Sequence, residues 1–263
     1  MNVAGKRVLL TGATGGLGHA IARRLAAAGA DIVLSGRRGD ILADLASEIG
    51  AEVAPADLAD AQAVRALAAA HTGVDILVSN AGLSAAGVID SWTEEQIDRA
   101  LDVNLRSAIM LARLLVPHMV ERRAGHLVFM SSLAGKSPTA GASLYNATKF
   151  GLRGFAGGLR AELHGTGVGV SAIFPGFIRD AGMFHESGAK LPFGVGTKSP
   201  EQVAQATLSA IEHNKAEVDV APVGLRIGSV LGGFVPDVAA AVTRGTGGQK
   251  IVEAHETAHM SKR

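Results

Sequence analysis

A glycine-rich loop joins the first strand-like run of this sequence to its first helical pattern, and it restricts the possible folds more than any other feature. The apolar run 8–11 leads directly into GATGGLG at 12–18, and a helical pattern continues to about Ala28. Glycines between a strand and a helix permit a tight turn, let the backbone approach a pyrophosphate, and leave helix N–H groups free for phosphate oxygens. A plain connecting turn is the alternative, but the strand before and the helix after favour dinucleotide binding.

Short apolar runs rich in β-branched residues alternate with helical patterns along most of the chain. The apolar runs lie at 8–11, 31–35, 52–56, 74–79, 126–131, 169–174 and 217–221. Helical patterns lie at about 17–28, 60–71, 94–121, 143–164 and 200–213. This alternation predicts an α/β fold of the doubly wound, Rossmann type, with a seven-stranded parallel sheet and helices on both faces. Ligands of such sheets bind at the carboxyl ends of the strands, at the switch point of the strand order.

Composition narrows the class of partner. There are 25 Lys and Arg against 24 Asp and Glu, so the formal charge of +1 gives no reason to expect nucleic acid, and a small-molecule substrate is expected. The absence of cysteine excludes disulfides and thiolate-bound metal. The first strand-like run begins too early for a signal peptide, and Pro, Arg or Asp interrupts every long apolar stretch. We expect a cytoplasmic protein without a transmembrane segment.

The length suits one α/β domain, which we place at 1–245. Within it, the glycine-rich segment 178–199 has no clear period and is interpreted as a mobile lid over the substrate. An apolar wall for an apolar substrate is suggested by Phe177, Met183, Phe184, Leu191 and Phe193, with a loop that packs on its own core as the alternative. The small and apolar segment 224–245 is interpreted as a helical cover of the pocket or a subunit contact, with a membrane-surface element as a third alternative. A polar tail follows at 246–263.

Two arginines follow the second strand-like run, where an acidic residue would hold the ribose hydroxyls of NAD. Ser35 and Gly36 precede Arg37 and Arg38, and no carboxylate occupies this position. Guanidinium groups can bind a 2′-phosphate through charge-assisted hydrogen bonds, and one can also stack on adenine. This pattern favours NADP(H) over NAD(H). Solvated arginines at the start of a helix would give the same sequence, and Asp40 keeps NAD(H) as an alternative.

Two further segments follow the third and fourth predicted strands. Their residues are Asp57, Leu58, Asn80, Ala81 and Gly82. Taken alone, an Asn and a Gly after a strand are ordinary turn formers. Because these segments share the sheet edge of the glycine loop, we expect them to contact the cofactor.

The single tyrosine of the chain, Tyr145, lies four residues before Lys149 and thirteen after Ser132. Residues four apart on a helix share a face, so the phenol and the ammonium would point into the same space. A nearby cation lowers a tyrosine pKa of about 10, which makes the phenol usable as a general acid, with Ser132 as a second donor to the same oxygen. For this spacing alone, a half-buried tyrosine beside a solvated lysine is the alternative.

These motifs occur in one order along the chain. They are the glycine loop 12–18, SNAG at 79–82, Asn104, Ser132, Tyr145 and Lys149. Over about 6–221 this order resembles the short-chain dehydrogenase/reductase family. The glycine spacing fits both the short enzymes and the longer, epimerase-like branch of the family. The chain length, the spacing from Ser132 to Tyr145, SNAG, and Pro-Gly at 175–176 resemble the short branch.

The resemblance implies an NAD(P)-dependent enzyme that interconverts a carbonyl and a secondary alcohol by hydride transfer, with Tyr145 as general acid and base. It implies that Ser132 holds the substrate oxygen, that Lys149 binds the nicotinamide ribose and lowers the tyrosine pKa, and that Asn104 lies in a helix kink and holds a water. The implied cofactor contacts, besides Tyr145 and Lys149, are Gly12, Thr14, Gly16, Leu17, Gly18, Arg37, Arg38, Asp57, Leu58, Asn80, Ala81, Gly82, Pro175, Gly176 and Ile178. A homodimer or homotetramer is implied as well.

Two positions depart from the family pattern. Ser79 replaces the first Asn of NNAG, which is a mild change. Asp180 stands where the family usually has a threonine that hydrogen-bonds the nicotinamide carboxamide. A carboxylate can accept a hydrogen bond but cannot donate one unless it is protonated. That contact is therefore in question, and an Asp180 that faces solvent is the alternative.

The tail contains a literal HExxH at His255, Glu256 and His259. On a helix this motif presents two histidines to zinc, with the glutamate as base. A catalytic zinc site needs a third protein ligand and a packed cleft, and only four polar-tail residues follow. We expect no metal site.

Two other functions stay open from the sequence. A catalytically silent NADP(H)-binding sensor of the same fold would be expected to have lost Ser132, Tyr145 or Lys149, and this chain has all three. An epimerase-like enzyme acting on a nucleotide sugar would need a larger C-terminal substrate domain than 263 residues allow.

Overall fold

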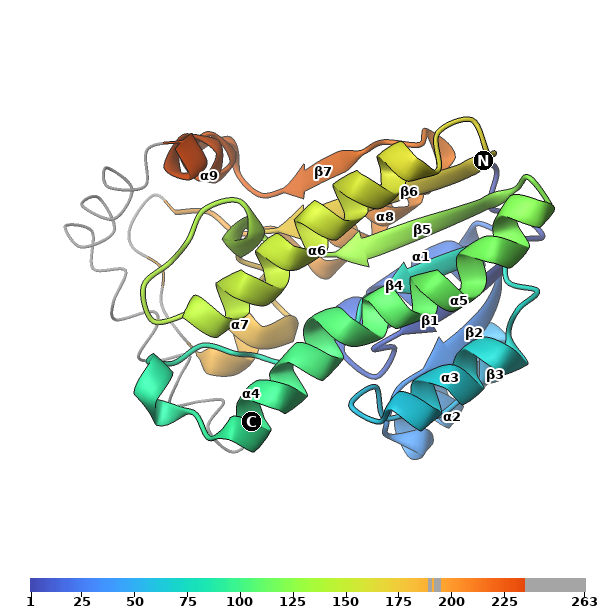
Figure 1. Ribbon diagram of the computed structural model, residues 1–263, viewed down its shortest axis with the longest axis horizontal. Coiled ribbons are helices and arrows are strands. Elements are labelled where there is room, and N and C mark those ends of the chain that lie inside the picture. The colour runs from blue at the N-terminus through green and yellow to red at the C-terminus, as the bar shows by residue number, and fades with distance from the viewer. Residues whose placement is uncertain (189–190, 192–194, 235–263) are drawn as a thin grey trace.

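Seven parallel strands form one sheet in the order β3-β2-β1-β4-β5-β6-β7 (Figure 1). The computed structural model describes residues 1–188, 191 and 195–234. The strands are β1 (Arg7–Thr11), β2 (Asp31–Ser35), β3 (Glu52–Val53), β4 (Ile76–Ser79), β5 (Gly125–Met130), β6 (Val168–Pro175) and β7 (Glu217–Val220). The order reverses between β1 and β4, so the switch point lies between these two strands. The predicted doubly wound fold with a seven-stranded parallel sheet is confirmed.

Helices cover both faces of the sheet (Figure 1). One layer contains α1 (Gly16–Ala27), α2 (Gly39–Ile49) and α8 (Pro200–Glu212). The other contains α3 (Ala61–Ala70), α5 (Ser107–Glu121) and α6 (Ser143–Glu162). The remaining helices are α4 (Glu94–Leu101), α7 (Gly182–Ser187) and α9 (Val223–Phe234), with short turns η1 (Ile89–Ser91), η2 (Asp102–Arg106) and η3 (Leu133–Gly135).

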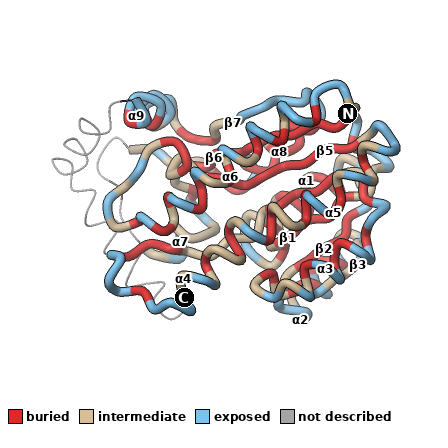
Figure 2. Tube along the Cα trace, viewed as in Figure 1, coloured by how far each residue is buried: buried red, intermediate tan, exposed pale blue. Residues whose placement is uncertain are grey.

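The two helical layers pack on opposite side chains of the same strands. In β1, Leu9 belongs to the core under α3 and α5, whereas Leu10 belongs to the core under α1 and α8. In β5, Val128 likewise belongs to the core under α1 and α8, and its neighbour Phe129 belongs to the core under α3 and α5. Since successive side chains of a strand point to opposite faces, a strand buried on both faces must be apolar at every position. Figure 2 shows the resulting continuous burial along the central strands.

The long predicted helix at 94–121 is present, but it contains one wide turn. Helix α4 continues through η2, a π-helical turn, into α5. By length and composition this run is long and apolar enough to cross a membrane, the one such helix in the described part of the chain. Leu111, Ala112 and Leu115 on its inner side are buried in the sheet core, and a core helix meets the same criteria.

Three segments differ from the prediction or extend past the described residues. Helix α2 lies between the second and third strands, where we predicted no helical range. The predicted lid contains a short helix, α7, which ends at Gly188 in the left-handed conformation. Helix α9 forms the described part of the predicted cover 224–245. Positions 235–263, including the tail and the motif at His255, Glu256 and His259, lie outside the described residues.

Candidate active site

The glycine loop after β1 is too tightly packed to accept side chains at two of its positions. Gly12 has a φ of +66°, and a Cβ there would lie 2.7 Å from the Ala81 Cα. A Cβ on Gly18 would lie 2.2 Å from the carbonyl oxygen of Gly12. Gly15, the N-cap residue of α1, offers no side-chain hydrogen bond to the helix. The first N–H groups of α1 are therefore available to an anionic ligand.

Asn80 holds the glycine loop against the end of β4. Its side-chain Nδ2 donates to the carbonyl oxygens of Thr11 and Gly12 at 3.1 and 3.2 Å. The backbone N–H groups of Asn80 and Ala81 both donate to Oγ1 of Thr11, at 3.1 and 3.2 Å. The side-chain amide of Asn80 thus holds the glycine loop that borders the cavity. The cofactor contact expected at 80–82 would therefore come from other atoms of these three residues.

Arg38 lies over the glycine loop, because its Nη2 donates to the carbonyl oxygen of Thr14 at 2.5 Å. Arg37 lines the same cavity. Asp57 accepts from the Ala59 N–H and from Nη2 of Arg99, each at 3.1 Å. Burial opposes ionisation of Asp57, but these two hydrogen bonds outweigh it and lower the pKa of the carboxyl. Arg99, which the sequence reasoning missed, therefore borders the adenine end of the expected site.

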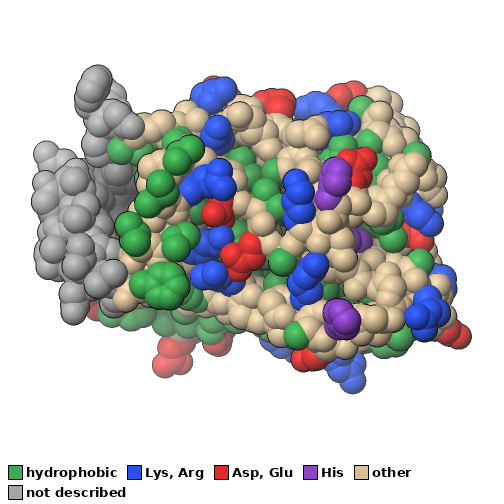
Figure 3. Space-filling model, turned by 90° about the horizontal axis from the view of Figure 1, so that it is seen from above, with side chains coloured by type: hydrophobic (Ala, Val, Ile, Leu, Met, Phe, Trp, Pro, Cys, Tyr) green, Lys and Arg blue, Asp and Glu red, His purple; other side chains and the backbone are tan. Residues whose placement is uncertain are grey.

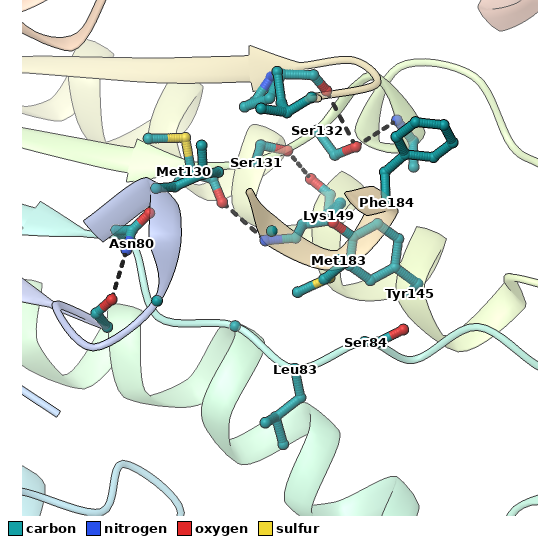
Figure 4. A pocket seen from close by; sticks show the side chains of 18 of the residues that line it. Asn80, Leu83, Ser84, Met130, Ser131, Ser132, Tyr145, Lys149, Met183 and Phe184 are labelled. Carbon is teal, nitrogen blue, oxygen red and sulfur yellow. Dashed lines mark hydrogen bonds between the residues drawn. The ribbon is translucent and has the colours of Figure 1, made fainter. Parts of the chain in front are cut away.

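Ser132, Tyr145 and Lys149 come together beside the ends of β5 and β6 (Figure 4). Ser132 follows β5 and caps η3, where its Oγ accepts from the Ala134 N–H at 3.2 Å. Tyr145 lies in the first turn of α6, and Lys149 lies one turn later on the same helix. The Lys149 Nζ donates to the carbonyl oxygen of Met130 at 2.9 Å. The predicted one-face arrangement on a helix is therefore present.

The pKa values of this pair differ from the sequence expectation. Burial raises the pKa of Tyr145 to about 12, although the Ser132 hydroxyl acts against this rise. Burial also lowers the pKa of Lys149 to about 8. The expected lowering of the tyrosine pKa by Lys149 is wrong for this structure. Loss of solvation dominates for the phenol, and the lysine amine is directed at the Met130 carbonyl.

Asn104 is buried in the π-helical turn η2, so the predicted irregularity of the helix is present. Its Oδ1 accepts from the Leu83 N–H at 2.6 Å, and its Nδ2 donates to the Leu83 carbonyl oxygen at 3.0 Å. This reciprocal pair fixes the segment after β4 against the helix. Asn104 is absent from the described lining of the cavity, and its role in holding a water stays a prediction.

One cavity of about 1570 Å³ connects these parts. Every residue expected to contact the cofactor lines it, and so does Ser132. Figure 4 shows Asn80 at one side of this pocket and the group of Ser132, Tyr145 and Lys149 at the other. Such a volume exceeds the roughly 300–1,000 Å³ of ordinary small-molecule sites. The cavity is large enough for a dinucleotide together with a second ligand.

The lid segment lies directly over the glycine loop and the catalytic candidates. A Cβ on Gly16 would lie 2.4 Å from the Ala181 Cβ, and one on Gly82 would lie 3.9 Å from the Met183 methyl carbon. Asp180 has a φ of +67° and its side chain, 68% exposed, pairs with Arg179 at 3.2 Å. It does not line the cavity. The alternative in which Asp180 faces solvent is the one that the structure supports.

The fold and the cavity define a class of protein. A Rossmann-type sheet with a glycine loop at its switch point, and a Ser-Tyr-Lys group in the same cavity, are features of oxidoreductases that use a nicotinamide dinucleotide. Comparison with known proteins identifies the family. A model of the short chain dehydrogenase family matches residues 6–192. The chain belongs to the short-chain dehydrogenase/reductase family and is an enzyme of that family.

Proteins similar to this chain in sequence, and solved structures similar to it in fold, are named as reductases and dehydrogenases. The ketoacyl reductase HetN of Nostoc is 36% identical over 227 residues, which cover 83% of this chain and 79% of that protein. The NADP-dependent 3-hydroxy acid dehydrogenase YdfG of Salmonella typhi is 37% identical, over 65% of this chain and 72% of that protein. A solved short-chain dehydrogenase from Sphingobium yanoikuyae in complex with NADPH superposes with a TM-score of 0.76 at 27% identity, over 89% and 95% of the two chains.

Proposed function

We propose that this enzyme interconverts a carbonyl group and a secondary alcohol with NADP(H), with Tyr145 as the general acid and base. The observation that carries the proposal is the single cavity that contains both the glycine loop and the group of Ser132, Tyr145 and Lys149. The names of the relatives, a ketoacyl reductase and an NADP-dependent 3-hydroxy acid dehydrogenase, support it.

The residues of the cavity fit a dinucleotide phosphate. The close approach of Gly12 to Ala81 and the uncapped start of α1 form a side-chain-free cradle for a pyrophosphate. Arg37 and Arg38 follow β2, where they would bind a 2′-phosphate, and Arg38 already lies against the loop at Thr14. Asp40 lies one residue into α2 and is absent from the described lining of the cavity. These features support NADP(H) over NAD(H).

The chain's own residues would supply the proton and the orientation. With a pKa of about 12, Tyr145 keeps its proton at neutral pH and can donate it to a carbonyl oxygen as negative charge develops there. The Ser132 hydroxyl, on the same side of the cavity, would hold that oxygen as a second donor. Lys149, one turn along the same helix and lining the same cavity, would bind the nicotinamide ribose. A bound reduced nicotinamide supplies the hydride that the protein lacks.

The test is an assay of the purified protein with a panel of ketones, aldehydes and 3-oxo esters, in which NADPH or NADH consumption is followed by absorbance. We expect turnover with at least one carbonyl class and a lower KM for NADPH than for NADH. NADPH binding without turnover across the panel would instead support a cofactor sensor. A lower KM for NADH would contradict the assignment of Arg37 and Arg38.

A further inference from the structure

Helix α9 contributes three glycines to the substrate end of the cavity, together with the side chains of Leu225, Ser229 and Leu231. By the substrate end we mean the lining residues 83, 84, 86, 177, 183, 184, 186, 195, 224, 225, 228, 229, 231 and 232. Gly224, Gly228 and Gly232 line the cavity at intervals of four, so they lie on one face of α9. A Cβ on Gly224 or Gly228 would meet nothing within 4 Å. We call these three positions the glycine face of α9. The space in front of Gly224 and Gly228 is bounded by helix backbone, with the side chains of Leu225, Ser229 and Leu231 beside it.

This face is close to the catalytic group. The second half of α9 packs on the loop that contains Ser132, because a Cβ on Gly233 would lie 2.7 Å from the carbonyl oxygen of Lys136. The turn η3, which contacts α9, begins directly after Ser132. A substrate whose oxygen is held by Ser132 and Tyr145 would therefore have the glycine face of α9 within reach of its carbon skeleton.

The opposite wall of the substrate end is apolar. In Figure 4, Met183 of α7 is drawn beside Tyr145 and Phe184 beside Ser132, and the centres of the Phe184 and Phe177 rings are 5.0 Å apart. Leu83 and Leu225 add further apolar surface. Among the described residues of the substrate end, Glu186 is the one charged side chain. An anionic substrate group would meet no described cation there, whereas an alkyl chain would be removed from water.

We propose, on the basis of the proposed function, that the substrate is a neutral ketone or its alcohol with an extended, unbranched apolar tail, and that this tail lies along the glycine face of α9. A bare helix backbone allows a linear chain to approach closely, and Gly228 at the middle of the face determines how much tail fits. A carboxylate a few carbons from the ketone would have to enter the apolar part of the cavity, so hydroxy acids are disfavoured as substrates.

The first experiment measures kcat/KM with NADPH for the methyl ketones from 2-butanone to 2-dodecanone, with 5-oxohexanoate as the charged counterpart of 2-hexanone. Each methylene that enters the cavity should raise kcat/KM by about fourfold until the space is filled. We expect 5-oxohexanoate to be at least about tenfold poorer than 2-hexanone. A kcat/KM that is independent of chain length, or equal for these two compounds, would overturn the inference.

The second experiment places a side chain on the glycine face. Gly228→Leu should lower the ratio of kcat/KM for 2-decanone to that for 2-butanone by at least about tenfold, since its isobutyl group would occupy the path of the tail. Val230→Leu is the matched control, because Val230 is 45% exposed on the outer side of α9, where apolar side chains gather in Figure 3. Its ratio should equal that of the parent enzyme.

The outcomes separate the two proposals. NADPH binding and thermal unfolding show whether each variant is folded. Reduction of short and long ketones with a ratio that Gly228→Leu leaves unchanged would overturn the tail position and leave the proposed function intact. A protein that binds NADPH but reduces no ketone in the series, and no other carbonyl compound, would overturn both.

Discussion

The side-chain amine of Lys149 lies 5.5 Å from the centre of the Tyr145 ring and donates to the carbonyl oxygen of Met130 at 2.9 Å. Burial moves the two pKa values in opposite directions, to about 8 for Lys149 and about 12 for Tyr145. At neutral pH the pair is therefore an ammonium beside a neutral phenol. That is the protonation state in which tyrosine can act as an acid toward a carbonyl.

The free energy of unfolding should rise between pH 8 and 10. An unfolded lysine keeps its proton to a pKa of about 10.5, so in this range the unfolded state binds one more proton than the folded state. The expected gain approaches about 1.4 kcal/mol per pH unit. Above about pH 10, Tyr145 has the opposite effect, since the folded protein retains that proton to a pKa of about 12. Urea unfolding of the parent and of Lys149→Met at several pH values measures the difference, and a constant difference from pH 7 to 10 would contradict the lowered lysine pKa.

Tyr145→Phe should reduce kcat by at least about 100-fold, because it removes the proposed proton donor and little else. NADPH affinity should change by less than about threefold, since the ring and Lys149 remain. Steady-state kinetics and a cofactor titration on the same preparation provide both numbers. Turnover at the parental rate would exclude Tyr145 as the acid. An equal loss of affinity and turnover would indicate a damaged site instead.

Replacing both Arg37 and Arg38 by alanine should weaken NADPH binding about tenfold to a hundredfold and change NADH binding much less. The expected loss corresponds to one or two charge-assisted hydrogen bonds to a phosphate. Arg65→Ala, an exposed arginine of α3 away from the cavity, is the control for the loss of positive charge. Dissociation constants for both cofactors at fixed ionic strength test this prediction. Equal weakening of both would mean that the two arginines do not recognise the 2′-phosphate.

The features that the sequence predicted well depend on short-range rules. Residues four apart share a helix face, so Tyr145 and Lys149 could be paired from their spacing alone. The carboxyl ends of parallel strands share one sheet edge, so the glycine loop, Asp57 and Asn80 could be assigned to one site. Both rules require only the positions of the helices and strands and the direction in which the chain runs through them.

The homo-oligomer is expected from the family resemblance and the cytoplasmic location from composition. Both stay predictions.

The remaining features depend on contacts between distant parts of the chain. Arg99 reaches Asp57 across 42 residues, and nothing local in the sequence marks that pair. The orientation of Asp180 follows from a left-handed backbone conformation that is rare for a non-glycine residue. The raised pKa of Tyr145 results from its surroundings in the folded protein, which the spacing to Lys149 cannot reveal. The glycine face of α9 can be connected with the substrate only because α9 packs beside the loop after Ser132, which the sequence does not show.

Lys136, which follows η3, forms the least exposed ion pair that the structure describes between the catalytic loop and β7. Its side chain is 6% exposed, its Nζ lies 2.5 Å from Asp219 Oδ1 and 2.9 Å from Glu217 Oε2, and it stacks over the Phe174 ring at 4.0 Å. Without Lys136, the Asp219 carboxylate, whose side chain is 13% exposed, keeps one described cation, Arg226 at 4.0 Å, so most of the compensation of its charge is lost. Lys136→Met should therefore lower the free energy of unfolding by about 3 kcal/mol.

Arg153→Met is the matched control for this prediction, because Arg153 pairs with Glu217 at the exposed edge of the same network, with 40% of its side chain exposed. We expect this variant to lose less than about 1 kcal/mol, as is usual for ion pairs in contact with solvent. Urea unfolding of both variants at pH 7 measures the two losses. Equal losses of unfolding free energy would mean that the greater burial of Lys136 does not make its ion pair more stabilising than that of Arg153. A larger loss for Lys136→Met, accompanied by a higher KM for ketones, would show that this ion pair also holds the loop of Ser132 and the adjoining α9 in position for the substrate.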